Sequence, residues 1–163
     1  MIRLTQGSLL QANVEALVNA VNTEGVMGKG IALQFKKAFP DNFAAYEAAC
    51  RRRDVEVGKM FVFEAAGVDG PRWIINFPTK KHWRQPSTMG YIRYGLADLV
   101  EVTKRLGIRS LAVPPLGCGL GGLDWPVVRV AIEAAMSEVP DVEVLIFEPI
   151  AAPQATPTGV RGR

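Results

Sequence analysis

Two stretches decide the fold, and both contain the same three parts in the same order. Residues 16–35 read "ALVNAVNTEGVMGKGIALQF" and residues 110–128 read "SLAVPPLGCGLGGLDWPVV". In each, an apolar run leads into a glycine-rich loop, and the loop leads into a segment with helical apolar spacing. Glycine lets the backbone approach a ligand closely and adopt positive φ, so successive N–H groups can bind an anion. Two such loops at the carboxyl ends of strands suit a diphosphate held from both sides.

The rest of the chain continues the alternation of strands and helices. Apolar runs predict strands at residues 2–6, 16–21, 60–65, 73–77, 110–115 and 142–148, and helical spacing predicts helices at 30–39, 43–53, 88–106 and 126–139. Pro40 ends the first helix, Asp41 and Asp124 are predicted N-caps, and Gly107 closes the third helix. This alternation indicates an α/β sheet with helices on both faces.

Composition limits the class of protein. The 163 residues suit one domain, and 19 basic against 16 acidic side chains give a net charge of +3. No apolar run is long enough to cross a bilayer, no signal peptide is evident, and two cysteines form no disulfide framework. We therefore expect a cytoplasmic protein without metal or cofactor. Residues 1–150 form the predicted domain, and residues 151–163 ("AAPQATPTGVRGR") a flexible linker or tail.

Neither glycine loop matches a nucleotide motif convincingly. Gly117, Gly119 and Gly122 have the dinucleotide spacing, but they lie late in the chain, with a single strand after them. The first loop is not a Walker A motif, because Lys29 is followed by Gly30 and not by Ser or Thr. Nucleoside triphosphate chemistry is therefore not expected.

A third stretch, "WIINFPTKKHWR" (residues 73–84), places a dense polar cluster after a predicted strand. It is either a solvated turn or a segment that holds Lys80 over a site. Lys81, His82, Trp83 and Arg84 combine basic and aromatic groups, as in surfaces that stack a base beside a phosphate. A dyad of Cys118 and His82 is a further, weaker reading.

The loops and this cluster resemble a known family. "ALVNAVNTEGVMGKGIALQFKKAFP" and "VPPLGCGLGGLDW" resemble the two ADP-ribose-binding segments of macrodomains, over about residues 1–150. With "NFPTKKHW", the chain is most similar to the terminal ADP-ribose glycohydrolase-like subgroup, and within it to antitoxins that remove ADP-ribose from DNA. The resemblance implies a three-layer α/β/α fold with a mixed, mostly parallel sheet of about six strands.

The resemblance also implies roles for individual residues. Lys80 matches the catalytic lysine, Asn22 would bind the distal ribose, and Phe147 would lie beside the adenine. The full predicted ADP-ribose set is Ser8, Leu9, Asn19, Asn22, Gly28, Lys29, Gly30, Ile31, Thr79, Pro115, Gly117, Cys118, Gly119, Leu120, Gly121 and Phe147. Lys81, His82, Trp83 and Arg84 would contact single-stranded DNA, and a toxin ADP-ribosyltransferase is the implied partner. From the residues alone, Asn19 and Asn22 could equally be strand-end polar groups bonded to the backbone.

Two positions depart from the family pattern. Ser8 stands where many macrodomains have an acid that reads adenine, and Gly121 stands where a related glycohydrolase has an aspartate. Lys80 would then work without that acid, either as a neutral nucleophile at the anomeric carbon or as a charged hydrogen-bond donor. The expected activity is hydrolysis of ADP-ribose from a nucleobase of single-stranded DNA. A non-catalytic ADP-ribose reader and an esterase for acylated ADP-ribose remain alternatives.

Overall fold

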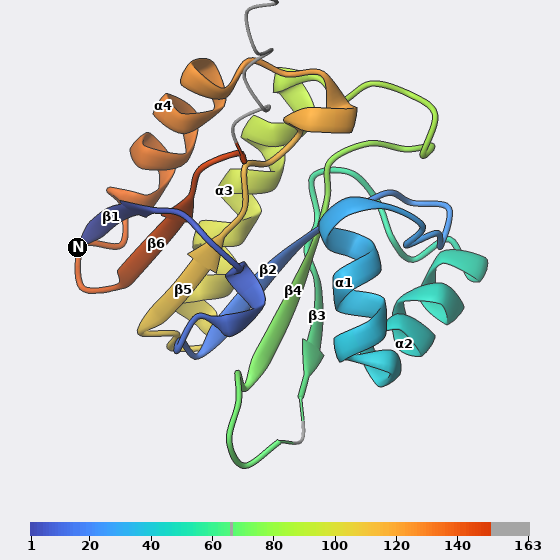
Figure 1. The fold of residues 1–163 in the computed structure, drawn as a ribbon, viewed down its shortest axis with the longest axis horizontal. Helices are drawn as coiled ribbons and strands as arrows, with labels where there is room; N and C mark the ends of the chain where they lie inside the picture. Colours follow the sequence, from blue (N-terminus) through green and yellow to red (C-terminus); the bar gives the residue numbers. More distant parts are fainter. Residues whose placement is uncertain (66, 151–163) are drawn as a thin grey trace, which may run out of the picture.

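The computed structural model describes residues 1–65 and 67–150, so the predicted tail at 151–163 lies outside the described residues. A six-stranded sheet has the order β1-β6-β5-β2-β4-β3 (Figure 1). The strands are β1 (Ile2–Thr5), β2 (Ala16–Val21), β3 (Phe61–Glu64), β4 (Trp73–Pro78), β5 (Ser110–Val113) and β6 (Glu143–Phe147). All neighbours are parallel except β3, which is antiparallel to β4. The mixed, mostly parallel sheet is thus confirmed.

Helices cover both faces of the sheet. They are α1 (Gly30–Ala38), α2 (Pro40–Arg51), α3 (Met89–Arg105) and α4 (Trp125–Met136), with short 3-10 turns η1 (Leu9–Gln11) and η2 (Gly119–Gly121). Helices α3 and α4 pack together on one face, and α1 and α2 pack together on the other (Figure 1). The three-layer α/β/α prediction is confirmed.

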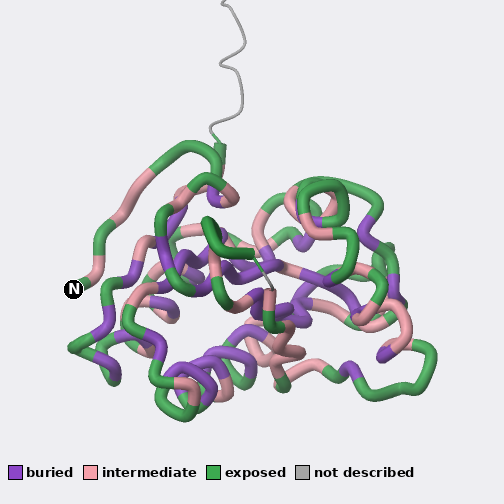
Figure 2. Tube along the Cα trace, turned by 90° about the horizontal axis from the view of Figure 1, so that it is seen from below, coloured by how far each residue is buried: buried purple, intermediate pink, exposed green. Residues whose placement is uncertain are grey.

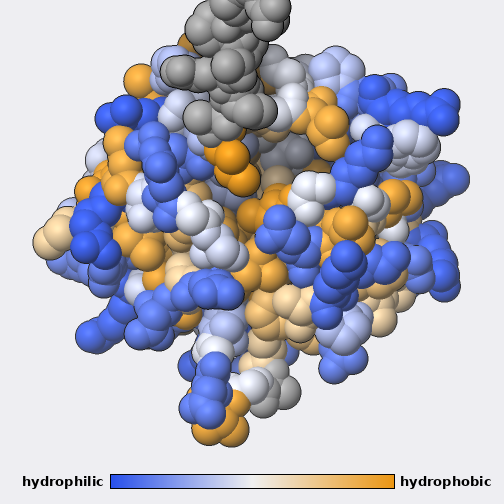
Figure 3. Space-filling view, viewed as in Figure 1, coloured by the Kyte–Doolittle hydropathy of each residue, from blue (hydrophilic) through white to orange (hydrophobic). Residues whose placement is uncertain are grey.

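The core forms because successive strand residues alternate between the two layers. Val18, Ile75 and Val113 are buried under α3 and α4, whereas Leu17 and Ile74 are buried on the opposite face with Phe35 of α1 and η1 residues. Figure 2 shows the buried residues concentrated along the strands and the inner sides of the helices. On the face viewed in Figure 3, hydrophobic residues gather near the middle and hydrophilic residues surround them.

Helix boundaries differ from the predictions by a few residues. Asp41 is not an N-cap, because Pro40 is itself the first residue of α2 and Asp41 lies in its first turn. Proline suits that position, since the first N–H of a helix has no partner within the helix. Asp124 is the N-cap residue of α4, but its side chain makes no capping bond. Thr88 does cap α3, accepting from the N–H of Tyr91 at 3.2 Å.

The parallel arrangement brings the important loops together. Five strands run in the same direction, so residues following β1, β2, β4, β5 and β6 emerge at one edge of the sheet. Both glycine loops and the segment after β4 therefore lie at the same edge.

Among the described residues, no helix is long and apolar enough to cross a membrane.

Candidate active site at the carboxyl edge of the sheet

The first glycine loop, residues 22–29, is organised by the side chain of Asn22. Its amide Nδ2 donates to the carbonyl of Val26 at 2.9 Å, and its Oδ1 accepts from the N–H of Glu24 at 2.9 Å. Tyr46 of α2 donates its hydroxyl to the same Oδ1 at 2.9 Å and to the Asn22 carbonyl at 2.7 Å. Only 5% of Asn22 is exposed. Its side chain shapes the loop, and direct contact with a ribose stays a prediction.

Asn19 and Leu9, both in the predicted ADP-ribose set, have buried side chains. Asn19 is fully buried within β2, where its Nδ2 donates to Oδ1 of Asn76 at 3.2 Å and lies 3.8 Å from the sulfur of Met27. Its Oδ1 is buried without a hydrogen-bond partner among the described residues, and contact of Asn19 with ADP-ribose stays a prediction. The side chain of Leu9 packs in the core under η1, so only its backbone could face a ligand.

Residues 79–88, which we call the arch, connect β4 to α3. In Figure 1, the arch extends outward from the end of β4 and returns to the start of α3 beside η2. At its start, the N–H of Thr79 donates to Val21 at 2.8 Å, and the N–H of Thr23 donates to the carbonyl of Lys81 at 3.0 Å. At its end, the N–H of Ser87 donates to the carbonyl of Gly121 at 3.0 Å. The arch is thus attached to both glycine loops.

Lys80 lies near the start of the arch and is only partly exposed. Its Nζ donates to the backbone carbonyl of Trp83 at 3.3 Å. Burial lowers the pKa of the Lys80 ammonium, because a low-dielectric setting disfavours the charged form. This raises the fraction of neutral amine, which is the form able to act as a nucleophile.

The following residues form a stacked surface. The rings of His82 and Trp83 stack with centroids 5.1 Å apart, and the guanidinium of Arg84 lies 4.5 Å from the Trp83 ring centroid. Trp83 is 43% exposed although it is large and apolar. Lys81 extends over the ring of Tyr91, with 6.0 Å between its Nζ and the ring centroid. An exposed aromatic face among cations can stack a base beside a phosphate.

The second glycine loop, residues 114–122, requires glycine for two different reasons. Gly117 and Gly119 have φ of 72° and 70°, values that favour glycine. Gly117 also has no room for a side chain, because an added Cβ would lie 2.6 Å from Cδ1 of Leu123. At Gly119, no described residue other than its chain neighbours would lie within 4 Å of such an atom. Gly119 and Leu120 are exposed, so the loop presents its backbone to solvent at η2.

Cys118, within this loop, is a poor nucleophile. Burial, together with the nearby carboxylate of Asp124, raises the pKa of the Cys118 thiol to about 11. The reactive thiolate is therefore scarce near neutral pH. This chemistry argues against the Cys118–His82 dyad.

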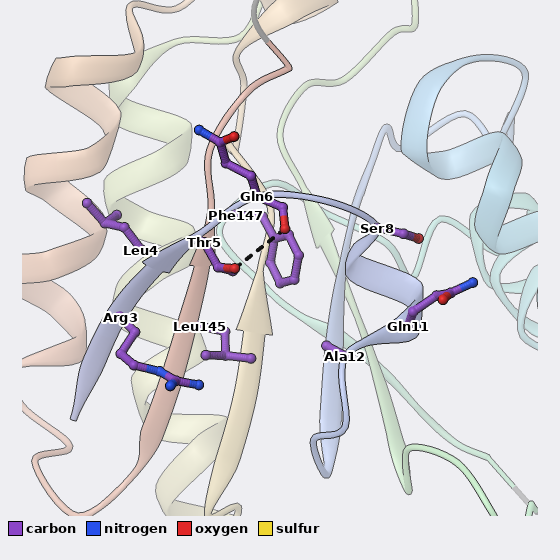
Figure 4. A pocket seen from close by; sticks show the side chains of 9 residues that line it. All are labelled: Arg3, Leu4, Thr5, Gln6, Ser8, Gln11, Ala12, Leu145 and Phe147. Carbon is purple, nitrogen blue, oxygen red and sulfur yellow. Dashed lines mark hydrogen bonds between the residues drawn. The ribbon is translucent and has the colours of Figure 1, made fainter.

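A hollow of about 370 Å³ opens at the same edge, beside β1, β6 and η1. Figure 4 shows the Phe147 ring in its wall, with Ser8 and Gln11 on the η1 side and Thr5 and Gln6 at the end of β1. Its lining residues are Arg3, Leu4, Thr5, Gln6, Ser8, Gln11, Ala12, Leu145 and Phe147, none of them an acid. An aromatic wall with hydroxyls and amides suits a flat, uncharged heterocycle.

Comparison with known proteins identifies the family. Residues 18–132 match the Macro domain family model. The chain is a macrodomain. This macrodomain is 55% identical to a Thermus aquaticus protein named DNA ADP-ribosyl glycohydrolase, over 95% of this chain and 43% of that one. It matches the solved macrodomain of Mycobacterium tuberculosis DarG with a TM-score of 0.91 and 56% identity, over 92% of this chain and 99% of that one.

Thermosipho africanus DarTG, solved in complex with ADP-ribose, matches at 36% identity and a TM-score of 0.85, over 91% of this chain and 42% of that one. The macrodomain spans less than half the length of the curated proteins named DNA ADP-ribosyl glycohydrolase that it matches. The family prediction, made from the two glycine loops, is confirmed.

The structure of this macrodomain adds residues that the sequence did not reveal. Tyr46 and Thr23 hold the first loop, and Ser87 joins the arch to the second loop. Neither a helical tyrosine nor a serine before a helix carries a recognisable signal in one sequence. Within residues 1–65 and 67–150, no group of three or more His, Cys, Asp or Glu side chains could hold a metal ion.

Proposed function

We propose that this macrodomain is a DNA ADP-ribosyl glycohydrolase, a hydrolase that removes ADP-ribose from the base of a thymidine in single-stranded DNA. It would reverse the action of a toxin ADP-ribosyltransferase in the cytoplasm. The observation that carries the proposal is the position of Lys80, a partly desolvated amine on an arch attached to both glycine loops. The names of the relatives support it, including a transferase–glycohydrolase fusion protein from Thermosipho africanus.

Each part of the site has a role in this proposal. The backbone N–H groups of the two loops bind the diphosphate, with the N-terminus of α1 directly behind the first loop. The hollow beside Phe147 takes the adenine, and the distal ribose lies between the loops under Lys80. The stack of half-buried His82 with exposed Trp83 and Arg84 holds the DNA strand next to the modified base.

The reaction uses the neutral amine of Lys80. Its lone pair forms a bond to the anomeric carbon while the bond from that carbon to the base nitrogen breaks, through an oxocarbenium-like transition state. The leaving base takes up the proton that the lysine nitrogen loses. Water then attacks the same carbon and releases ADP-ribose and free lysine. No carboxylate pair is needed, because the attacking group is an amine.

The test is release of ADP-ribose from an ADP-ribosylated single-stranded DNA oligonucleotide. We expect release by the wild type and a loss of at least about 100-fold for Lys80→Ala, with ADP-ribose affinity by calorimetry kept within a few fold. Lys104→Ala, which removes an exposed lysine on α3, is the matched control and should release at the wild-type rate.

Other outcomes distinguish the alternatives. A wild type that binds ADP-ribose but releases nothing from DNA, or from acylated ADP-ribose, would be a reader. Release from acylated substrates alone, retained in Lys80→Ala, would be the mark of an esterase.

A further inference from the structure

The arch is bonded to both glycine loops at its two ends, and its middle residues bond to one another, because the N–H groups of Arg84 and Gln85 each donate to His82 at 3.0 Å. Its first residues bond to Val21 and Thr23, at the first glycine loop. Its last residues bond to Gly121, in the second glycine loop. Residues 83–86 between these attachments are all exposed. Lys80 lies between the bonds that Thr79 and Lys81 make to the first loop, and its Nζ donates to the Trp83 carbonyl at 3.3 Å. Its position therefore depends directly on the start of the arch and, through Trp83, on how the rest of the arch is held.

At the second attachment, the side chain of Ser87 packs into the space that the glycine at position 121 leaves empty. Ser87 is 5% exposed, and its N–H donates to the carbonyl of Gly121 at 3.0 Å. A Cβ added at Gly121 would lie 2.6 Å from Oγ and 3.2 Å from Cβ of Ser87. The side chain of Ser87 thus occupies the space that any side chain at position 121 would need. A Cβ added at Gly117 would also come within 3.1 Å of the Ser87 Cβ.

Among the described residues, none forms a hydrogen bond with the hydroxyl group of Ser87. A buried hydroxyl without a partner costs stability, so this group is not retained for a bond within the free protein. What Ser87 supplies here is volume and a backbone N–H, both directed at Gly121. We call this pair the joint.

We propose that the Ser87–Gly121 joint positions Lys80 relative to the second glycine loop, which binds the diphosphate in the proposed function. Ser87 is then a positioning residue, and this inference rests on the proposed function. With both ends of the arch fixed to loops that grip the same ligand, Lys80 is held over the distal ribose when the diphosphate is bound. A displacement of about 1 Å at a reacting group can cost about 100-fold in rate.

The test makes the side chain at position 87 smaller and the side chain at position 121 larger, first separately and then together. Ser87→Gly empties the space beside Gly121, and Gly121→Ala overfills it. We expect each single variant to release ADP-ribose from modified single-stranded DNA about tenfold more slowly in single turnover. In the double variant, the methyl group at 121 fills the space vacated at 87, and most of the rate should return.

Three controls accompany the exchange. Thermal unfolding of each variant establishes that it is folded at the assay temperature. Calorimetry with ADP-ribose should give a Ser87→Gly affinity within about threefold of the wild type, because the binding loops remain. Gln85→Gly adds the same backbone freedom at an exposed arch position and should keep the rate within about twofold.

Each outcome decides the proposal. Recovery in the double variant, with affinity unchanged, supports a joint that positions Lys80. A double variant no faster than the slower single variant, a fully active Ser87→Gly, or an equal loss in Gln85→Gly would each overturn it. Failure of the wild type to act on modified DNA would instead remove the proposed function.

Discussion

At the scale of single residues, Lys80 combines a backbone hydrogen bond with partial burial. Burial lowers its pKa, so the neutral amine becomes available at lower pH than for a lysine with the ordinary pKa of about 10.4. Below its pKa the lone pair is occupied by a proton, and above it the nucleophile is fully present.

We therefore predict that the single-turnover rate of ADP-ribose release rises with pH and levels off at a lower pH than a lysine of ordinary pKa would give. The measurement is a pH–rate profile on modified single-stranded DNA with saturating enzyme. A rate that falls as pH rises would contradict the nucleophilic role and assign Lys80 as a charged hydrogen-bond donor.

Cys118 gives a second prediction at this scale. Because burial and the Asp124 carboxylate raise its pKa to about 11, alkylation by iodoacetamide should be slow near neutral pH and accelerate up to about pH 11. Asp124→Asn removes the negative charge, so the thiol pKa should fall and alkylation at a fixed pH should become faster. Mass spectrometry of the Cys118 peptide follows both reactions. Unchanged alkylation in Asp124→Asn would show that burial alone sets the pKa.

At the scale of elements, the second glycine loop contains one glycine that is required for its positive φ and another that is required for its positive φ and for lack of space. An alanine at Gly119 must adopt φ near 70° but meets open space, which costs about 1–2 kcal/mol. An alanine at Gly117 has the same unfavourable positive φ, and its Cβ also lies too close to Leu123. We predict that Gly117→Ala lowers the free energy of unfolding by about 1–3 kcal/mol more than Gly119→Ala. Urea denaturation of both variants measures the difference, and equal losses would contradict the steric part.

The element boundaries also show what local patterns predict. Apolar runs located every strand to within two residues, because a strand buried on one or both faces needs apolar side chains wherever it meets a helix layer. Capping was less predictable. Asp41 and Thr88 are both good capping residues, yet only Thr88 caps a helix, since Pro40 already starts α2 one residue earlier. Pro40 therefore set the start of α2, and Asp41 lies inside the helix.

At the scale of the whole molecule, the net charge of +3 is less informative than its distribution. Arg51 and Arg52 are exposed but paired with acids, at 2.7 Å from Glu47 and 2.9 Å from Asp54. Lys81 and Arg84 instead lie against the aromatic rings of Tyr91 and Trp83. The second pair is therefore the better candidate for contacts with phosphates.

We predict that Lys81→Ala with Arg84→Ala weakens binding of unmodified single-stranded DNA and lowers the slope of log K against log salt by about 1.4. Two lost phosphate contacts at about 0.7 each give that value. Fluorescence anisotropy over a salt series measures it. The matched double variant Arg51→Ala with Arg52→Ala should keep the wild-type slope, and an equal loss there would indicate only a general charge effect.

The sequence by itself determined the family, the α/β alternation and both glycine loops, because strand burial and loop geometry demand particular residue types over short, contiguous stretches. It also located Lys80 and the basic–aromatic cluster at a strand end. Only the tertiary structure decided that Asn19 is buried, that Asn22 holds its own loop through Tyr46, and that Ser87 fits against Gly121. These features depend on contacts between segments far apart in the chain, and such contacts leave no local pattern in a single sequence.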